Sequence, residues 1–135
     1  MSVGSGIMHS EYNHSKSAPA KFFQIWIEPK EEDIAPRHDK KAFSFEKNSL
    51  TLIVSGKKDK HAMHIHQDAK ISLGRYDASK SIRYSTNKGL FIFVIEGSIE
   101  VNGEKLNRRD SFETDEDVQI KMITESFFMI IEVPL

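Results

Sequence analysis

The sequence predicts an all-β protein, because three of its features are typical of short strands joined by tight turns. Runs rich in β-branched and aromatic residues recur from about residue 42 to the end of the chain. Turn-forming residues separate these runs, and Asn102-Gly103 is the strongest hairpin signal, since a two-residue type I′ turn needs positive φ at both positions. No segment shows a sustained helical period. Strands with this spacing are typical of a sandwich or a barrel.

The first 41 residues differ from the rest of the chain. Residues 1–20 are rich in Ser, Gly and Ala, and taken alone they predict a flexible arm. A strand is predicted over residues 21–28, where aromatic and β-branched residues precede Pro29. The charged segment 29–41, with a second proline at Pro36, predicts a linker that wraps the surface.

Six further strands are predicted after this arm. Each is a short apolar, β-branched or aromatic run that ends at turn residues. They cover residues 50–54, 63–76, 90–96, 98–101, 118–123 and 126–133. The sequence therefore predicts a single barrel that is preceded by an N-terminal arm and an extra strand.

Composition and charge narrow the class of protein. The chain has 135 residues, of which 39% are hydrophobic and 29% charged, as is usual for a soluble globular domain. Its 19 basic and 20 acidic residues give a net charge of -1, which argues against direct binding of nucleic acid or of an anionic membrane. The absence of cysteine excludes disulfides, thiolate metal sites and cysteine nucleophiles. With no secretion signal and no apolar run near the roughly 20 residues that span a bilayer, we expect a cytoplasmic protein.

Four segments of the chain resemble the pirin family of two-cupin proteins. The most specific is the run GSGIMHSE at residues 4–11, which is similar to the family's Gly-x-Gly-Ile-x-His-Ser-Glu segment. The other segments are residues 22–27, 65–69 and 101–106, and residues 90–110 also resemble the middle of a cupin jelly roll. The resemblance implies a cupin-type jelly-roll barrel over residues 42–135, the C-terminal cupin domain. It also implies that residues 1–41 are a remnant of the N-terminal cupin and a linker.

His9 and Glu11 are the first candidate metal ligands. They stand two residues apart, so on an extended strand their side chains leave the same face. Nitrogen and oxygen donors of this kind suit a divalent transition metal such as Fe, Ni, Zn or Mn. The resemblance implies that this pair is the later half of the family's four ligands, whose early His-Pro-His segment has no counterpart here. Two interpretations stay open: a remnant whose metal is lost, or a working site that His14 or a second copy of the chain completes.

The C-terminal barrel is predicted to lack metal at the usual cupin site. When Gly97 is aligned with the closing glycine of the cupin metal motif, the glutamate position falls on Leu90 and the two histidine positions fall within residues 83–86. The final histidine position falls on Ile120. Apolar side chains cannot coordinate a hard or borderline cation.

His64 and His66 are the second candidate pair. On a regular strand they would share one face with Asp68, and the opposite face would carry the apolar residues Met63, Ile65, Ala69, Ile71 and Leu73. Burial of the apolar set turns the histidines toward solvent or a shallow groove. We predict a polar outer face here, and the alternative is an adventitious Zn or Ni site at His64 and His66.

Two functions are compatible with these observations. The first is a pirin-like, non-enzymatic binding or regulatory module, whose partner is a protein or a small aromatic ligand. The alternative, which the resemblance implies, is a metal-dependent dioxygenase of the quercetin 2,3-dioxygenase type, with Glu11 as ligand and proton acceptor beside His9. In either case the apolar strand at residues 21–28 needs a partner. We predict that it adds to the barrel or is exchanged between two chains in a homodimer.

Overall fold

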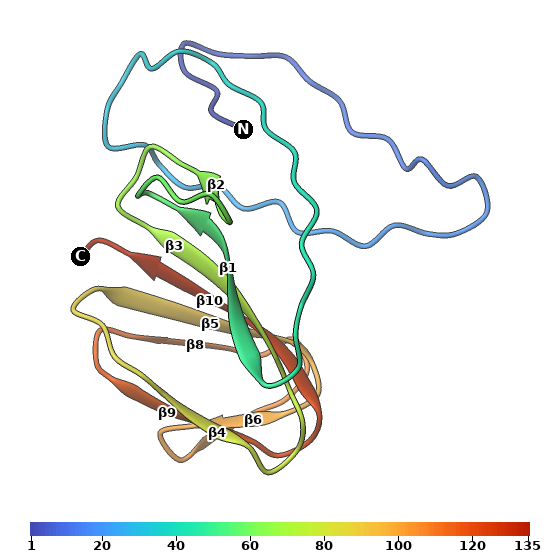
Figure 1. Cartoon of the computed structure of the whole chain (residues 1–135), viewed down its shortest axis with the longest axis vertical. Helices are drawn as coiled ribbons and strands as arrows, with labels where there is room; N and C mark the ends of the chain where they lie inside the picture. Colours follow the sequence, from blue (N-terminus) through green and yellow to red (C-terminus); the bar gives the residue numbers. More distant parts are fainter.

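The structure, a computed structural model, describes residues 1–135 and consists of an irregular N-terminal arm followed by two β-sheets (Figure 1). The all-β prediction is confirmed, because every regular element is a strand. The strands are β1 (Ser49–Ser55), β2 (Met63–His64), β3 (Lys70–Tyr76), β4 (Ser81–Tyr84), β5 (Gly89–Glu96), β6 (Ile99–Val101), β7 (Glu104–Leu106), β8 (Ser111–Thr114), β9 (Val118–Met122) and β10 (Ser126–Val133). Helices of the length and apolar character that crossing a membrane requires are not found.

The two sheets differ in size and lie face to face (Figure 1). The larger sheet has six strands in the order β2-β1-β3-β10-β5-β8, and the smaller has four in the order β4-β9-β6-β7. All neighbours are antiparallel except β1 and β2, which pair in parallel. Because β10 pairs with both β3 and β5, the last strand of the chain lies in the middle of the larger sheet.

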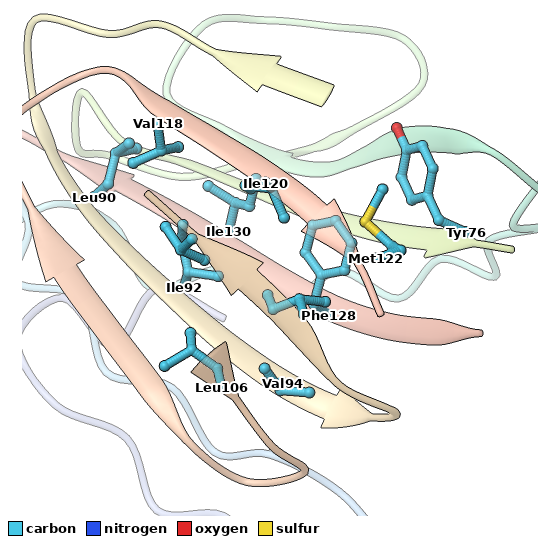
Figure 2. Packing of buried hydrophobic residues seen from close by; sticks show 12 residues of the cluster. Tyr76, Leu90, Ile92, Val94, Leu106, Val118, Ile120, Met122, Phe128 and Ile130 are labelled. Carbon is cyan, nitrogen blue, oxygen red and sulfur yellow. The ribbon is translucent and has the colours of Figure 1, made fainter. Parts of the chain in front are cut away.

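Alternation of side chains along the strands builds the core between the sheets. In β9, Val118, Ile120 and Met122 are buried while the two residues between them are exposed. Figure 2 shows the resulting cluster, whose twelve buried members are Tyr76, Leu90, Ile92, Val94, Ile99, Val101, Leu106, Val118, Ile120, Met122, Phe128 and Ile130. The two sheets are therefore held together by one continuous apolar layer.

A second apolar cluster involves the larger sheet and the arm. Its buried members are Val54, Ile71, Ile95 and Met129, and Ile27 of the arm packs against it. Strands β5 and β10 contribute to both clusters, so they are apolar on both faces, as expected for central strands that are covered on two sides. This second face is where the arm meets the barrel.

Most predicted strands are confirmed, with two differences in the barrel. The predicted strand over 63–76 is divided into β2 and β3, because bends interrupt it at residues 66–68. The short strands β4, β7 and β8 were not predicted, since four or fewer residues carry too little periodicity to be recognised. Their pairing with β9, β6 and β5 creates them.

The strand predicted over residues 21–28 is wrong for the single chain, where this segment forms no strand. High β-propensity is insufficient without a neighbouring strand to complete the backbone hydrogen bonds. The arm instead attaches to the loop after β2: Lys30 N donates to His66 O at 2.8 Å, and Gln67 Nε2 donates to Glu28 O at 2.9 Å. The Arg37 guanidinium also donates to His64 O.

Two glycines in turns, Gly97 between β5 and β6 and Gly103 between β6 and β7, form a matched pair that tests backbone strain. The φ of Gly97 is +84°, and a Cβ at this position would lie 2.2 Å from the backbone oxygen of Glu125. Gly103 has a similar φ of +90°, but a Cβ there would meet nothing within 4 Å. We expect Gly103→Ala to cost about 1–3 kcal/mol of backbone strain and Gly97→Ala to cost clearly more, because it adds a clash. Urea unfolding of both variants measures the difference, and equal losses would contradict the clash.

Candidate functional site

A groove of about 920 Å³ lies between the arm and the barrel. The barrel contributes an apolar floor, in which Ile53, Ile65 and Ile71 take part. The facing wall comes from the arm and includes Phe23, Ile25 and Ile27. Polar side chains complete the lining, and they comprise three histidines and five carboxylates besides smaller groups: His9, His38, His66, Glu11, Glu31, Glu32, Asp33 and Asp39. Chemically, this arrangement suits a largely apolar molecule that also carries hydrogen-bonding groups.

Aromatic contacts hold the arm wall against the barrel. The ring of Phe23 meets that of Phe93 in β5 edge to face, with 5.5 Å between the ring centroids. The guanidinium of Arg109 lies 5.9 Å from the centroid of the Phe23 ring, within range of a cation–π interaction. Phe23 therefore anchors the wall of the groove to β5.

The structure brings His9 and Glu11 to the same groove, where both line the arm side and are exposed. His14 is also exposed but is not among the lining residues. Nowhere in the chain do three or more His, Asp or Glu side chains gather as a metal site requires. Because metal centres in proteins usually use at least three protein ligands, the donors of one chain do not fit a metal at this position.

His64 and His66 lie close together, as their spacing predicted. Their rings meet edge to face with 5.2 Å between centroids. His66 lines the groove, whereas Nδ1 of His64 is buried without a hydrogen-bond partner. Asp68 turns away toward Lys88, because the strand is not regular beyond His64. The apolar side chains of Met63 and Ile65 pack on the second cluster, as predicted, and the adventitious metal site remains a prediction.

Inside the barrel, the positions of the cupin metal motif are occupied by packing residues. Leu90 and Ile120 are buried members of the core between the sheets. Tyr84, from the segment where the two histidines would fall, packs against the same core and donates its hydroxyl to Glu132 at 3.2 Å. These side chains do not fit a metal ion, which needs several converging nitrogen or oxygen donors.

Glu132 is a buried charged residue that sequence reasoning missed. It is 4% exposed and accepts hydrogen bonds from the hydroxyls of Tyr84 at 3.2 Å and Thr86 at 3.0 Å. Its second oxygen lies 3.1 Å from Lys70 Nζ. The available signal was its phase, because Glu132 follows Phe128 and Ile130 at intervals of two along an apolar strand.

The surroundings of Glu132 determine its ionisation. Burial by itself raises the pKa of this carboxyl, but the hydrogen bonds from Lys70 and Thr86 and the charge of Lys70 outweigh burial, so the pKa is lowered. Burial, followed by the negative charge of Glu132, raises the pKa of Tyr84 to about 12. At neutral pH the carboxylate is therefore ionised and the phenol remains a donor.

The sequence of the chain matches a known protein family. Residues 52–133 match the model of the quercetinase C-terminal cupin domain. A pirin-like protein of Caulobacter vibrioides is 36% identical over 115 residues, which are 82% of this chain and 49% of that protein. A quercetin 2,3-dioxygenase of Escherichia coli K12 is 27% identical over 138 residues, which are 99% of this chain and 59% of that protein. The chain thus spans about three fifths or less of the length of these relatives.

Solved structures show the same fold. The crystal structure of YhhW from Escherichia coli has a TM-score of 0.75 at 20% identity, covering 81% of this chain and 48% of that one. The nickel(II) complex of the bacterial pirin YhhW has a TM-score of 0.72 at 19% identity, covering 78% of this chain and 47% of that one. The predicted cupin jelly roll is therefore confirmed.

Proposed function

This chain belongs to the pirin family, and on that premise we propose that it is a non-enzymatic binding module whose groove receives a small aromatic ligand. The observation that carries the proposal is the groove between the arm and the barrel, with its apolar floor and its polar rim. Its volume of about 920 Å³ is in the range of small-molecule sites, roughly 300–1,000 Å³. A planar ring system can lie against Ile53 and Ile65 while its hydroxyl groups meet His9 or His66.

A metal-dependent quercetin 2,3-dioxygenase is the alternative function. It is supported by the names of the relatives and by the nickel(II) of the YhhW complex. It requires donors beyond His9 and Glu11, and a second copy of the chain is the source we propose, because two copies supply two imidazoles and two carboxylates. The exposed aromatic side chains of Phe22 and Trp26 support a homodimer formed through residues 21–28.

Quercetin is a suitable probe, because it tests binding and turnover in one set of samples. We expect isothermal titration to show binding to the full chain and absorbance to show no turnover when Ni, Fe, Co or Mn is supplied. Ile25→Ala should weaken binding about threefold to tenfold through lost apolar contact. Ile123→Ala is the matched control, because Ile25 and Ile123 are 40% and 43% exposed and only Ile25 lines the groove.

Metal content and oligomeric state separate the two functions. The binding module is expected to retain no metal that depends on His9, so elemental mass spectrometry should give the same result for the wild type and His9→Ala. One metal per two chains in a dimer, lost in His9→Ala together with quercetin turnover, would establish the alternative. Absence of quercetin binding, or equal weakening by Ile25→Ala and Ile123→Ala, would contradict the groove as the binding site.

A further inference from the structure

A second cavity, of about 250 Å³, lies at one end of the barrel and has no apolar residue in its lining. Antiparallel pairing brings the start of β3 and the end of β10 to this end, and residues 85–88, in the loop between β4 and β5, line the cavity. Figure 1 shows this loop on the same side of the molecule as the C-terminus. The lining residues are Lys57, Asp68, Lys70, Ser85, Thr86, Asn87, Lys88 and Glu132. None of them lines the groove between the arm and the barrel, so the two hollows are separate.

The charges around this cavity leave an excess of positive charge. Three ammonium groups face two carboxylates, and both carboxylates already have partners. Glu132 is bonded to Tyr84, Thr86 and Lys70. Asp68 lies 2.7 Å from Lys88 Nζ. The carboxylate oxygens of the lining are therefore already bonded to donors of the chain.

Donor capacity remains at the cavity. Lys57 makes no ion pair. The hydrogen bond and charge of Lys88 lower the pKa of Asp68 most, and the positive charge of Lys57 adds a smaller contribution. Lys70 is held by Glu132 yet remains partly open to solvent, and the side chain of Asn87 makes no hydrogen bond within the chain. An oxyanion in the cavity would receive charge-assisted hydrogen bonds from these groups.

From this juxtaposition we propose that the cavity binds a small anion with a carboxylate or phosphate group, between Lys57, Lys70 and Asn87. Glu132 is the positioning residue of this site. Anchored by two hydroxyl groups inside the barrel, it holds Lys70 at the cavity wall in a fixed orientation. The small volume and the wholly polar lining select a compact, strongly hydrated ligand, in contrast to the larger groove with its apolar floor.

Inorganic phosphate and succinate are the probes that test this site. Each is titrated calorimetrically into the full chain at constant ionic strength, with chloride as the reference anion. We expect at least one probe to bind, and Lys57→Gln to weaken that binding about tenfold through loss of a charge-assisted hydrogen bond. Lys58→Gln removes the same charge next to the cavity but not from its lining, so it should leave the affinity unchanged.

The outcomes are distinct. Binding of phosphate alone assigns a phosphate site, binding of succinate alone assigns a carboxylate site, and binding of both supports the shared chemistry. If neither probe binds more tightly than chloride, or if Lys57→Gln and Lys58→Gln weaken binding equally, the inference is overturned. Ile25→Ala should leave anion binding intact, so failure of the quercetin test does not affect this one.

Discussion

Replacing Phe128 with alanine is expected to lower the free energy of unfolding by about 3–5 kcal/mol, the usual cost of deleting a buried aromatic ring. Phe128 is 0% exposed, and its ring stacks on that of Tyr76 with 5.7 Å between centroids (Figure 2). A Cβ at Gly74 would lie 2.8 Å from Phe128 Cζ, so the glycine in β3 makes room for the ring. The cavity left by Phe128→Ala would therefore open between the two sheets.

Phe22→Ala is the matched control for this substitution, because Phe22 is 69% exposed on the arm. It should change the free energy of unfolding by no more than about 0.5 kcal/mol, as surface substitutions usually do. Urea denaturation at neutral pH measures both variants. A loss below about 1 kcal/mol for Phe128→Ala would contradict the placement of its ring in the core.

Glu132→Ala is expected to cost about 2–5 kcal/mol at neutral pH, because it leaves the part-buried hydroxyl groups of Tyr84 and Thr86 without their acceptor, at about 1–3 kcal/mol each. Lys70, Tyr84 and Thr86 would all lose the acceptor they now share. Glu132→Gln keeps the shape and should cost less, about 1–3 kcal/mol, because its amide oxygen can still accept from Tyr84 and Thr86 while its NH2 group, a donor, replaces the oxygen that faces Lys70. Glu113→Gln, on an exposed side chain, should be nearly neutral.

Acid stability gives a second readout for Glu132. The pKa of this carboxyl is lowered in the folded chain, so its contribution to stability is fully present above the unfolded value of about 4.3 and is lost as pH falls through the folded pKa. Glu132→Gln should therefore lose less stability than the wild type as the pH falls below about 4.3. If the wild type and Glu132→Gln lost stability equally as the pH falls, the fold would not favour the ionised form of Glu132. Glu113→Gln should follow the wild type.

Several features of the candidate sites could be predicted from sequence, and others could not. Alignment of Gly97 with the cupin metal motif placed the apolar residues Leu90 and Ile120 at ligand positions, and both side chains are buried in the core between the sheets. Glu132 was also detectable from its phase with Phe128 and Ile130. The strand predicted at residues 21–28 failed because the strength of an isolated signal does not reveal whether a pairing partner exists.

The sequence by itself determined the all-β class, the inward-facing residues of the long strands and the apolar character of the barrel interior, because these depend on a period of two along the chain. Only the tertiary structure decided where the arm lies and which polar groups meet at the end of the barrel. The groove depends on contacts between the arm and residues 64–67, and the polar cavity gathers Lys57, Lys70, Lys88 and Glu132 from four segments. These contacts form because strands far apart in the chain pair with one another. The alternation of residues along one strand does not show which other strand it pairs with.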